Sequence, residues 1–202
     1  MNRRLVLATR NPNKVCEISA LLAELPLEVI SLRELPATAV VREDQPTYAG
    51  NAWKKAAATA TVAGKGAIIM ADDSGLEVEA LDGLPGVRAA RFAGPDADDA
   101  ANNRLLLEKL KGVPSEKRGA AFKCTIALLF PDGKSSYIEE SCSGLIAEFP
   151  RGEAGFGYDP LFIYEPTGLT FAEMSAEAKN RVSHRGRALR RARLALEQWL
   201  EQ

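Results

Sequence analysis

The sequence predicts a mixed α/β fold, in which a long twisted central sheet has parallel and antiparallel parts and helices flank its faces. Three observations support this prediction. Strand-like and helix-like segments alternate through the first third of the chain. Two long apolar segments flank Pro131-Asp132-Gly133, a turn sequence that is typical of a hairpin. Amphipathic helical segments then close the chain. Two lobes around a substrate cleft are the expected arrangement.

The first part of the chain alternates strands and helices. Asn11 is placed to cap a helix and Pro12 occupies the first helical position, and apolar residues then recur at helical spacing until Pro26. The other segments predicted here are a strand over Leu5–Thr9, a strand over Leu27–Leu32, a polar loop over 33–46, an alanine-rich helix over Tyr48–Ala63 and a buried strand over Ala67–Ala71.

The second part begins with the turn-like residues Asp72-Asp73-Ser74-Gly75. Thr170 and Glu173 have the spacing of a capping box that opens a helix, and Ser183 is placed to cap the last helix. The remaining predictions are a strand over Leu76–Leu81, a turn over Asp82–Gly86, a helix over Asp96–Lys111, two hairpin strands over Ala120–Phe130 and Lys134–Ala147, and a glycine-rich loop over 150–160.

Composition places the chain among soluble globular proteins. Of its 202 residues, 46% are hydrophobic and 26% are charged, and the net charge is −1. This length favours a single domain over residues 1–202. The near-zero charge gives no support for a nucleic-acid partner, and no apolar run approaches the length of a membrane helix. Three dispersed cysteines and the lack of a signal peptide predict reduced thiols and a cytoplasmic location.

The first segment with chemical potential is a strand that leads into a capped helix. Such a helix N-terminus offers backbone N–H groups and a positive dipole end to an anion. A lysine in the first turn is disfavoured by the same dipole, so its presence suggests a nearby phosphate. The alternative is an ordinary capped helix with an exposed lysine. The segment reads Thr9-Arg10-Asn11-Pro12-Asn13-Lys14.

A pair of carboxylates follows the buried strand. Asp72 and Asp73 could bind Mg²⁺, which prefers oxygen ligands and retains waters and substrate phosphates. Successive strand residues point to opposite faces, so one aspartate is expected to face the site. Glu43 could supply a further oxygen. The alternatives are an ordinary polar turn and a solvated loop glutamate.

Two further segments complete the set. Gly155-Phe156-Gly157-Tyr158-Asp159-Pro160 combines glycines with aromatic rings that could stack on a base, although a tight turn with core aromatics fits equally well. The stretch 179–193 holds seven cations, no carboxylate and the sole histidine, His184. It favours a phosphate-bearing ligand, and its alternative is the solvated face of a helix.

These four segments, in this order and spacing, closely resemble the inosine/xanthosine triphosphate pyrophosphatases. That family hydrolyses deaminated purine triphosphates to the monophosphate and pyrophosphate. The most specific matches are Ala-Asp-Asp-Ser-Gly-Leu, Gly-Phe-Gly-Tyr-Asp-Pro and Ser-His-Arg-Gly. The resembling segments are Ala8–Glu17, Tyr48–Ala56, Ala71–Gly94, Gly155–Phe162 and Ala172–Leu189, so the resemblance covers the whole chain.

The resemblance implies Mg²⁺ as cofactor, a nucleoside triphosphate as substrate and a homodimer. It implies Asp73, Lys14 and Lys55 as catalytic residues and Glu43 and Asp73 as metal ligands, with Asp73 as general base. Arg10 stands where the family often has glycine. The implied substrate contacts are Thr9, Arg10, Asn11, Pro12, Asn13, Lys14, Ser74, Phe156, Gly157, Tyr158, Asp159, Lys179, His184 and Arg185.

Three other functions remain open at this point. A relative acting on modified pyrimidine triphosphates is disfavoured by the basic Ser-His-Arg segment. A non-catalytic nucleotide sensor could keep the phosphate turn but would not need Asp73 and Glu43 together. A nucleic-acid-binding module could use the 179–193 face, and salt-dependent binding would reveal it.

Overall fold

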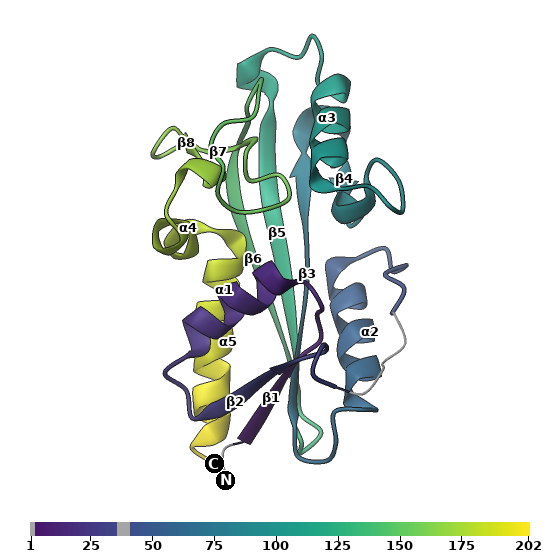
Figure 1. The fold of residues 1–202 in the computed structure, drawn as a ribbon, viewed down its shortest axis with the longest axis vertical. Coiled ribbons are helices and arrows are strands. Elements are labelled where there is room, and N and C mark those ends of the chain that lie inside the picture. The colour runs from purple at the N-terminus through teal and green to yellow at the C-terminus, as the bar shows by residue number, and fades with distance from the viewer. Residues whose placement is uncertain (1–2, 36–40) are drawn as a thin grey trace. The chain divides into compact units, whose positions relative to one another are not determined.

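The computed structural model describes residues 3–35 and 41–202, and within them eight strands form one sheet. Strand order is β2-β1-β3-β5-β6-β7-β8, and β4 pairs with β3 (Figure 1). The strands are β1 Arg3–Leu7, β2 Leu27–Ser31, β3 Ile68–Val78, β4 Pro85–Gly86, β5 Gly119–Leu129, β6 Ser135–Ile146, β7 Phe162–Tyr164 and β8 Leu169–Thr170. The helices are α1 Pro12–Leu22, α2 Tyr48–Ala60, α3 Asp99–Lys109, α4 Ala176–Val182 and α5 His184–Leu200.

The sheet is mixed, as predicted. β1 runs parallel to both β2 and β3, whereas β3 pairs antiparallel with β4, and β7 pairs antiparallel with β6 and β8. The chain divides into two compact units. The first unit comprises Met1–Asp73, Cys124–Glu140 and Gly186–Gln202, and the second unit comprises Ser74–Lys123 and Ser141–Arg185. The predicted cleft stays a prediction.

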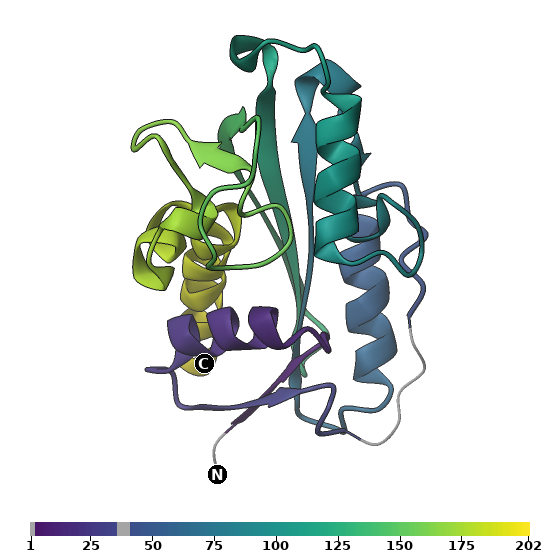
Figure 2. The same cartoon turned by 45° about the horizontal axis from the view of Figure 1, so that its top comes forward.

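Strand alternation builds the first unit from two apolar layers. Leu5 and Leu7 of β1 pack with α1 and α5, whereas Val6 packs with the alanines of α2. On β3, Met70 belongs to the first layer and Ala71 to the second. Figures 1 and 2 show α1 and α5 together, with α2 on the other side of these strands.

The second unit has an aromatic core. Phe122 of β5 lies with its ring centroid 4.7 Å from that of Phe162 and 5.7 Å from that of Phe171. Leu106 and Leu110 of α3 are fully buried in the same cluster. Ring pairs at these separations stabilise a core beyond the area that they bury. This cluster therefore anchors α3 and the segments that lead into α4.

Several predicted elements are confirmed. Asn11 caps α1, and its side chain accepts from the N–H groups of Asn13 and Lys14. The hairpin is formed by β5 and β6, and the last helix occupies His184–Leu200. In α5 the side chains of Leu189, Ala192 and Leu196 are buried, as the apolar spacing of that helix requires.

The prediction that the buried strand ends at Ala71, with Asp72 and Asp73 after its end, is wrong. β3 runs without interruption from Ile68 to Val78 and so includes the first part of the strand predicted over Leu76–Leu81. The rest of that predicted strand, Glu79–Leu81, forms a 3-10 helix. Polar residues favour turns only when they reach water, and here buried partners compensate both carboxylates. The aspartates therefore lie inside the sheet rather than at its edge.

Smaller differences concern element ends and short elements. The helix α3 begins at Asp99 rather than at Asp96, because Asp98 supplies the N-cap. The capping box of Thr170 and Glu173 opens only a 3-10 turn, and Ser175 caps α4 separately. β4, β7 and β8 have two or three residues each, too few for a pattern to show. Residues 36–40 of the predicted loop lie outside the described residues.

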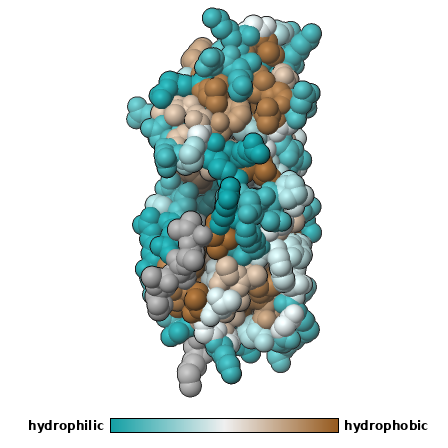
Figure 3. Space-filling model, turned by 90° about the vertical axis from the view of Figure 1, so that its right-hand side faces the viewer, coloured by the Kyte–Doolittle hydropathy of each residue, from teal (hydrophilic) through white to brown (hydrophobic). Residues whose placement is uncertain are grey.

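The surface agrees with the ordinary composition. Figure 3 shows a face on which hydrophilic residues surround smaller groups of hydrophobic ones. Within residues 3–35 and 41–202, no helix combines the length and the hydropathy that a membrane crossing requires. The cysteines Cys16, Cys124 and Cys142 are all free thiols.

Candidate active site

The turn between β1 and α1 is held by its own side chains. Thr9 Oγ1 accepts from the Asn11 N–H at 3.1 Å. Asn11 Oδ1 accepts from the N–H groups of Asn13 at 2.9 Å and Lys14 at 3.4 Å. The sequence predicted free N–H groups for an anion, but in this state the cap already uses these three. An anion that binds here must therefore displace a cap contact or bind mainly to side chains.

Lys14 has a different partner from the one that the sequence suggested. Its ammonium lies 3.0 Å from Oδ1 of Asp72, whose carboxylate is buried on the α1 side of the sheet. This buried anion explains why a lysine is tolerated in the first turn of a helix, where the dipole disfavours it. The ion pair accounts for Lys14 without a phosphate, and a phosphate near Lys14 stays a prediction.

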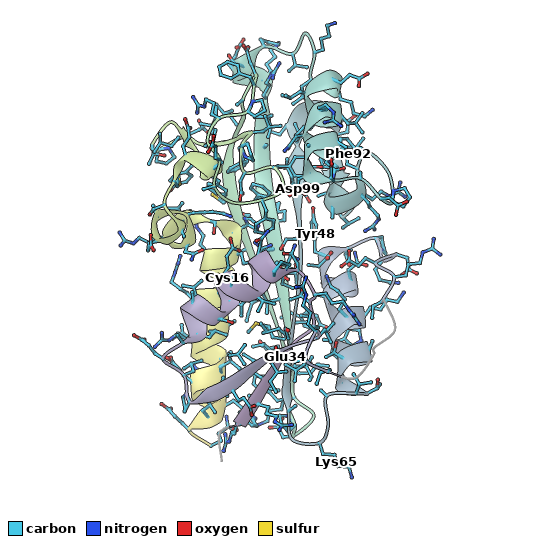
Figure 4. The ribbon with its side chains drawn as sticks, viewed as in Figure 1. Cys16, Glu34, Tyr48, Lys65, Phe92 and Asp99 are labelled. Carbon is cyan, nitrogen blue, oxygen red and sulfur yellow. The ribbon has the colours of Figure 1, made fainter. Side chains whose placement is uncertain are left out.

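Lys55 is the hub of the first unit. Helix α2 begins at Tyr48, labelled in Figure 4, and carries Lys55 on its buried face. The Nζ atom donates to Glu43 Oε1 at 2.7 Å, to Asp73 Oδ1 at 2.8 Å and to the backbone oxygen of Asp72 at 2.6 Å. With Lys55 only 8% exposed, these contacts fix both predicted metal ligands around one cation. We name Lys14, Glu43, Lys55, Asp72 and Asp73 the acid–lysine cluster.

Asn51 connects this cluster to the loop before α2. Its Nδ2 donates to Asp73 Oδ2 at 3.1 Å, and its Oδ1 accepts from the Gln45 N–H at 3.0 Å. The side chain is completely buried, one helical turn from Lys55 on the same face of α2. Both oxygens of Asp73 are therefore oriented by α2.

Burial and charge act in opposite directions on this cluster. Burial raises the pKa of Asp73, and Glu43 adds to that rise, while Lys55 opposes both; the pKa stays above its ordinary value. Burial also lowers the pKa of Lys55, but the carboxylates of Asp73, Glu43 and Asp72 together outweigh it and leave that pKa raised. Lys55 therefore stays protonated, and Asp73 is a stronger base than an exposed aspartate.

The oxygen donors of this cluster suit Mg²⁺. Glu43 and Asp73 both contact the Lys55 ammonium, so the two carboxylates lie in the same neighbourhood. Nowhere in the described chain do three or more His, Cys, Asp or Glu side chains gather as a metal centre. Mg²⁺ uses one or two carboxylates and completes its shell with water and substrate phosphate, so two ligands are sufficient.

In the second unit, Asp159 organises the glycine-rich turn. Its Oδ2 accepts from the Phe156 N–H at 2.8 Å and from Lys179 Nζ at 2.7 Å. Gly155 has φ +79°, and a Cβ there would lie 2.1 Å from the same oxygen. Only glycine fits this position. The buried ion pair between Asp159 and Lys179 joins the turn to α4.

Two cations lie against the ring of Phe156. Lys179 Nζ is 5.0 Å and Arg185 Cζ is 5.3 Å from the ring centroid, distances at which a cation is attracted to the ring. Arg185 Nη2 also donates to Ser74 Oγ at 3.4 Å. We name Ser74, Phe156, Asp159, Lys179 and Arg185 the aromatic–cation cluster.

Tyr158 and His184 are packed into the second unit. Tyr158 donates its hydroxyl to the Ala89 oxygen at 2.8 Å, and burial, with a smaller effect of Asp99, raises the pKa of the phenol. Tyr158 is therefore a core residue, which agrees with the alternative of a tight turn with core aromatics, and its stacking on a base stays a prediction. His184 is buried too, with its ring stacked on Phe122 at 4.6 Å and 9°. Phe156 is the half-buried aromatic of this turn.

The last helix does not present its arginines as a free basic face. Arg191 binds Glu140 at 2.8 Å, and Arg193 binds Glu24 and Glu197 at 2.8 Å each. These carboxylates are distant in sequence or one helical turn away, so the run 179–193 by itself could not reveal them. Arg191 and Arg193 are thus paired with carboxylates, and nucleic-acid binding by α5 stays untested.

Sequence reasoning missed the residues that support the site. Arg33 donates to the Arg10 oxygen at 2.9 Å, and Glu34 (Figure 4) accepts from the Ser31 N–H at 2.8 Å. Asp99 and Asn103 of α3 bind Gly157. Asn51 is not among the missed residues, because Asn51 and Lys55 match the Asn-Ala-x-x-Lys-Ala helix of the family that the sequence resembles. The others lie in polar stretches that carry no motif.

Comparison with known proteins gives a consistent result. The sequence model of the Ham1 family matches residues 5–194. A dITP/XTP pyrophosphatase from Geobacter sulfurreducens is 53% identical over 92% of this chain and 92% of its own length, and one from Desulforamulus reducens is 50% identical over 94% and 93%. Among solved structures, the Ham1 protein of Staphylococcus aureus has a TM-score of 0.85 and 37% identity, over 96% of this chain and 98% of its own.

Proposed function

The chain belongs to the Ham1 family, and from this premise we propose that it hydrolyses deaminated purine nucleoside triphosphates to the monophosphate and pyrophosphate. Relatives at 50% identity or more carry the name dITP/XTP pyrophosphatase. ITP, dITP and XTP are the proposed substrates, and removal of aberrant purines from the nucleotide pool is the proposed role.

The observation that carries this proposal is the acid–lysine cluster. Glu43 and Asp73 surround the Lys55 ammonium at 2.7 and 2.8 Å, and Lys14 lies beside Asp72. A nucleotide-binding protein without chemistry would gain nothing from two buried carboxylates next to its phosphate site, because they repel the phosphates. Metal-assisted phosphoryl transfer needs both signs of charge.

The phosphate end of the substrate is assigned to this cluster. Glu43 and Asp73 would hold Mg²⁺, which when bound neutralises phosphate charge. Asp73 orients a water in line with the α-phosphorus and accepts its proton. Lys14 and Lys55 stabilise the negative charge that develops as the bond to pyrophosphate breaks. The turn Thr9-Arg10-Asn11-Pro12-Asn13 would provide the remaining phosphate contacts.

The base end is assigned to the aromatic–cation cluster. Phe156 offers its ring for stacking, and Gly157 allows close approach of the turn. Lys179, Arg185 and the backbone of His184 are donors, which match the 6-oxo acceptor of hypoxanthine or xanthine. Adenine presents an amino donor at this position and would leave these groups unmatched, a strong basis for rejection. Tyr158 and Asp159 would act by shaping the turn.

Four coarser points complete the proposal. One catalytic domain would comprise residues 1–202, since both clusters are required. Mg²⁺ is the proposed cofactor on the grounds of the oxygen donors. Three free thiols favour the cytoplasm. A homodimer, with no nucleic-acid or membrane partner, follows the family resemblance and the paired arginines of α5.

Replacement of Asp73 by Asn tests the chemistry. Asp73→Asn introduces an amide of nearly the same size as the carboxylate and leaves an oxygen that can accept from Lys55. It removes the negative charge, and with it the proposed general base and the anionic metal ligand. We expect kcat for pyrophosphate release from ITP to fall by about 10³-fold or more at saturating Mg²⁺. Glu28→Gln, an exposed change on β2, is the matched control. Full turnover of Asp73→Asn would contradict the assigned role of Asp73.

A further inference from the structure

The backbone of Gly157 is held on both sides by one helix. Asp99 Oδ2 accepts from the Gly157 N–H at 2.6 Å, and Asn103 Nδ2 donates to the Gly157 oxygen at 2.9 Å. Asp99 (Figure 4) and Asn103 are four residues apart in the first turns of α3, so they share a face of the helix. A single residue of the turn is thus fixed at its donor and at its acceptor by side chains more than fifty positions earlier in the chain.

The same helix also holds the segment against which the turn packs. Asn102 is buried, accepts from the Ala93 N–H at 2.8 Å and donates to the Ala90 oxygen at 3.2 Å. Ala89, in the adjoining 3-10 helix, accepts the Tyr158 hydroxyl at 2.8 Å. Two neighbouring residues of the turn are therefore connected to α3. Gly157 contacts the helix directly, and Tyr158 is connected to it through the segment that contains Ala89.

Asn103 keeps its contact at a cost. Its Oδ1 is buried and, within the described residues, has no hydrogen-bond partner. A buried polar atom without a partner destabilises a protein, and leucine is similar in size and favours helix more strongly. The contact of this amide is the one that its Nδ2 makes to the Gly157 oxygen at 2.9 Å.

We propose that α3 positions the base-recognition turn, with Asp99 and Asn103 as its positioning residues. This inference rests on the proposed function, because the turn carries Phe156, the proposed stacking platform. Gly157 has φ +63°, which glycine adopts freely, and glycine loses more conformational freedom on ordering than any other residue, so contacts at its N–H and its oxygen restrict the turn. Loss of either contact lets the turn sample other conformations. Part of the binding free energy of the nucleotide is then used to order the turn, so the nucleotide binds more weakly.

The test compares variants that differ only in this contact. Asp99→Ala and Asn103→Leu each remove one hydrogen bond, and we expect each to raise KM for ITP about fivefold while kcat changes less than twofold. Asp99→Asn retains an oxygen that can accept from Gly157, so it should return KM to within twofold of the unsubstituted protein. The Kd of inosine monophosphate, measured by calorimetry, should follow KM.

Asp98→Ala is the matched control. Asp98 caps the same helix by accepting from the Ala101 N–H at 2.7 Å, but it makes no contact with the turn in the described structure. It should lower the melting temperature without changing KM or the Kd. If Asp98→Ala raises KM as much as Asp99→Ala does, helix stability alone explains the effect and the positioning role is wrong.

Failure of the proposed function gives a different result. An unsubstituted protein that releases no pyrophosphate but binds inosine monophosphate would overturn the catalytic proposal, and weaker binding by Asp99→Ala would still support the positioning role. Unchanged KM and Kd in both Asp99→Ala and Asn103→Leu would overturn the positioning role in an active enzyme. A protein with neither activity nor nucleotide binding would overturn both.

Discussion

The Lys55 side chain connects the residues of the acid–lysine cluster. Its ammonium binds two carboxylates and a backbone oxygen, so it both stabilises buried charge and holds the proposed metal ligands together. Asn51, one turn earlier, orients the other oxygen of Asp73. At the scale of the residue, the structure and the chemistry thus depend on the same few contacts.

Replacement of Lys55 by Met should destabilise the folded protein by about 3 kcal/mol. The change leaves Asp73 buried without its cation, and removal of one partner from a buried ion pair has effects of this size. Urea unfolding of Lys55→Met, Asp73→Asn and the double variant measures the coupling between the two residues. We expect the double variant to be more stable than the sum of the single changes predicts.

Additive free energies of unfolding in that cycle would contradict the assigned ion pair. Lys54→Met is a suitable control, because Lys54 lies on the exposed side of the same helix and pairs with the exposed Asp44. This neighbouring variant should change the free energy of unfolding by less than 1 kcal/mol.

The two aromatic residues of the glycine-rich turn should respond differently to truncation. Phe156→Ala removes the proposed platform, and we expect KM for ITP to rise about tenfold. Tyr158→Phe removes only the hydroxyl that binds Ala89, so stability should fall by about 1 kcal/mol with little change in KM. Steady-state kinetics and thermal unfolding of both variants check this difference. Equal effects on KM would show that Tyr158 also contacts substrate.

At the scale of the element, hydrophobic periodicity and end signals predicted most of the fold. The Asn11 cap, the Pro131-Asp132-Gly133 hairpin and the apolar stripe of α5 are local, so sequence reveals them. The interior of β3 was mispredicted, because its polar residues are compensated by Lys14 and Lys55 from two different helices. No local pattern carries such long-range compensation.

The candidate site divides in the same way. Lys14, Lys55, Asp73 and Asp159 stand in motifs and were identified from the sequence. Asp99, Asn103 and Arg33 act on backbone atoms of distant turns, and a polar residue in a polar stretch gives no sign of such a contact. Residues that would bind substrate or metal are limited to a few residue types, so a motif can reveal them. Residues that support a distant backbone segment can be identified only once the fold is known.

The capping box after β8 should contribute to acid stability. The Thr170 N–H and, more weakly, its hydroxyl lower the pKa of Glu173 below its ordinary value of 4.5, with Arg151 assisting. A carboxyl with a lowered folded-state pKa stabilises the fold above its unfolded pKa, and this stabilisation is lost as the pH falls through the folded value. Stability should therefore decline below pH 4.5 partly through Glu173.

Glu173→Gln checks this contribution. Glutamine can still accept from Thr170 but does not titrate, so the difference in unfolding free energy between the two proteins should shrink as the pH falls from 6 to 3. Urea unfolding at several pH values measures that difference. A gap that stays constant over this range would show that Glu173 does not contribute to acid sensitivity.

At the scale of the whole molecule, chain continuity joins the two units. β3, β5 and β6 each contribute residues to both units, so unfolding one unit must disrupt strands of the other. We therefore expect a single cooperative thermal transition, with equal calorimetric and van't Hoff enthalpies. Differential scanning calorimetry of the protein without ligand tests this expectation. Two separate transitions would contradict it.

The proposed function assigns the two ends of one substrate to the acid–lysine cluster and the aromatic–cation cluster, which belong to different units. The phosphates are common to all nucleoside triphosphates, so discrimination must come from the base end. In the proposed function, donors at Lys179, Arg185 and His184 favour a 6-oxo acceptor over the amino group of adenine. The proposed function therefore combines hydrolysis of a nucleoside triphosphate with selection of its base.

The most direct test is pyrophosphate release from ITP, XTP, GTP and ATP, measured side by side with Mg²⁺. We predict that kcat/KM for ITP and XTP exceeds that for ATP by at least about a hundredfold, and GTP, which shares the 6-oxo group, measures how far the 2-amino position adds to this selectivity. Equal release from ITP and ATP would contradict the assigned base recognition, and no release from any of the four by the folded protein would contradict the assigned chemistry.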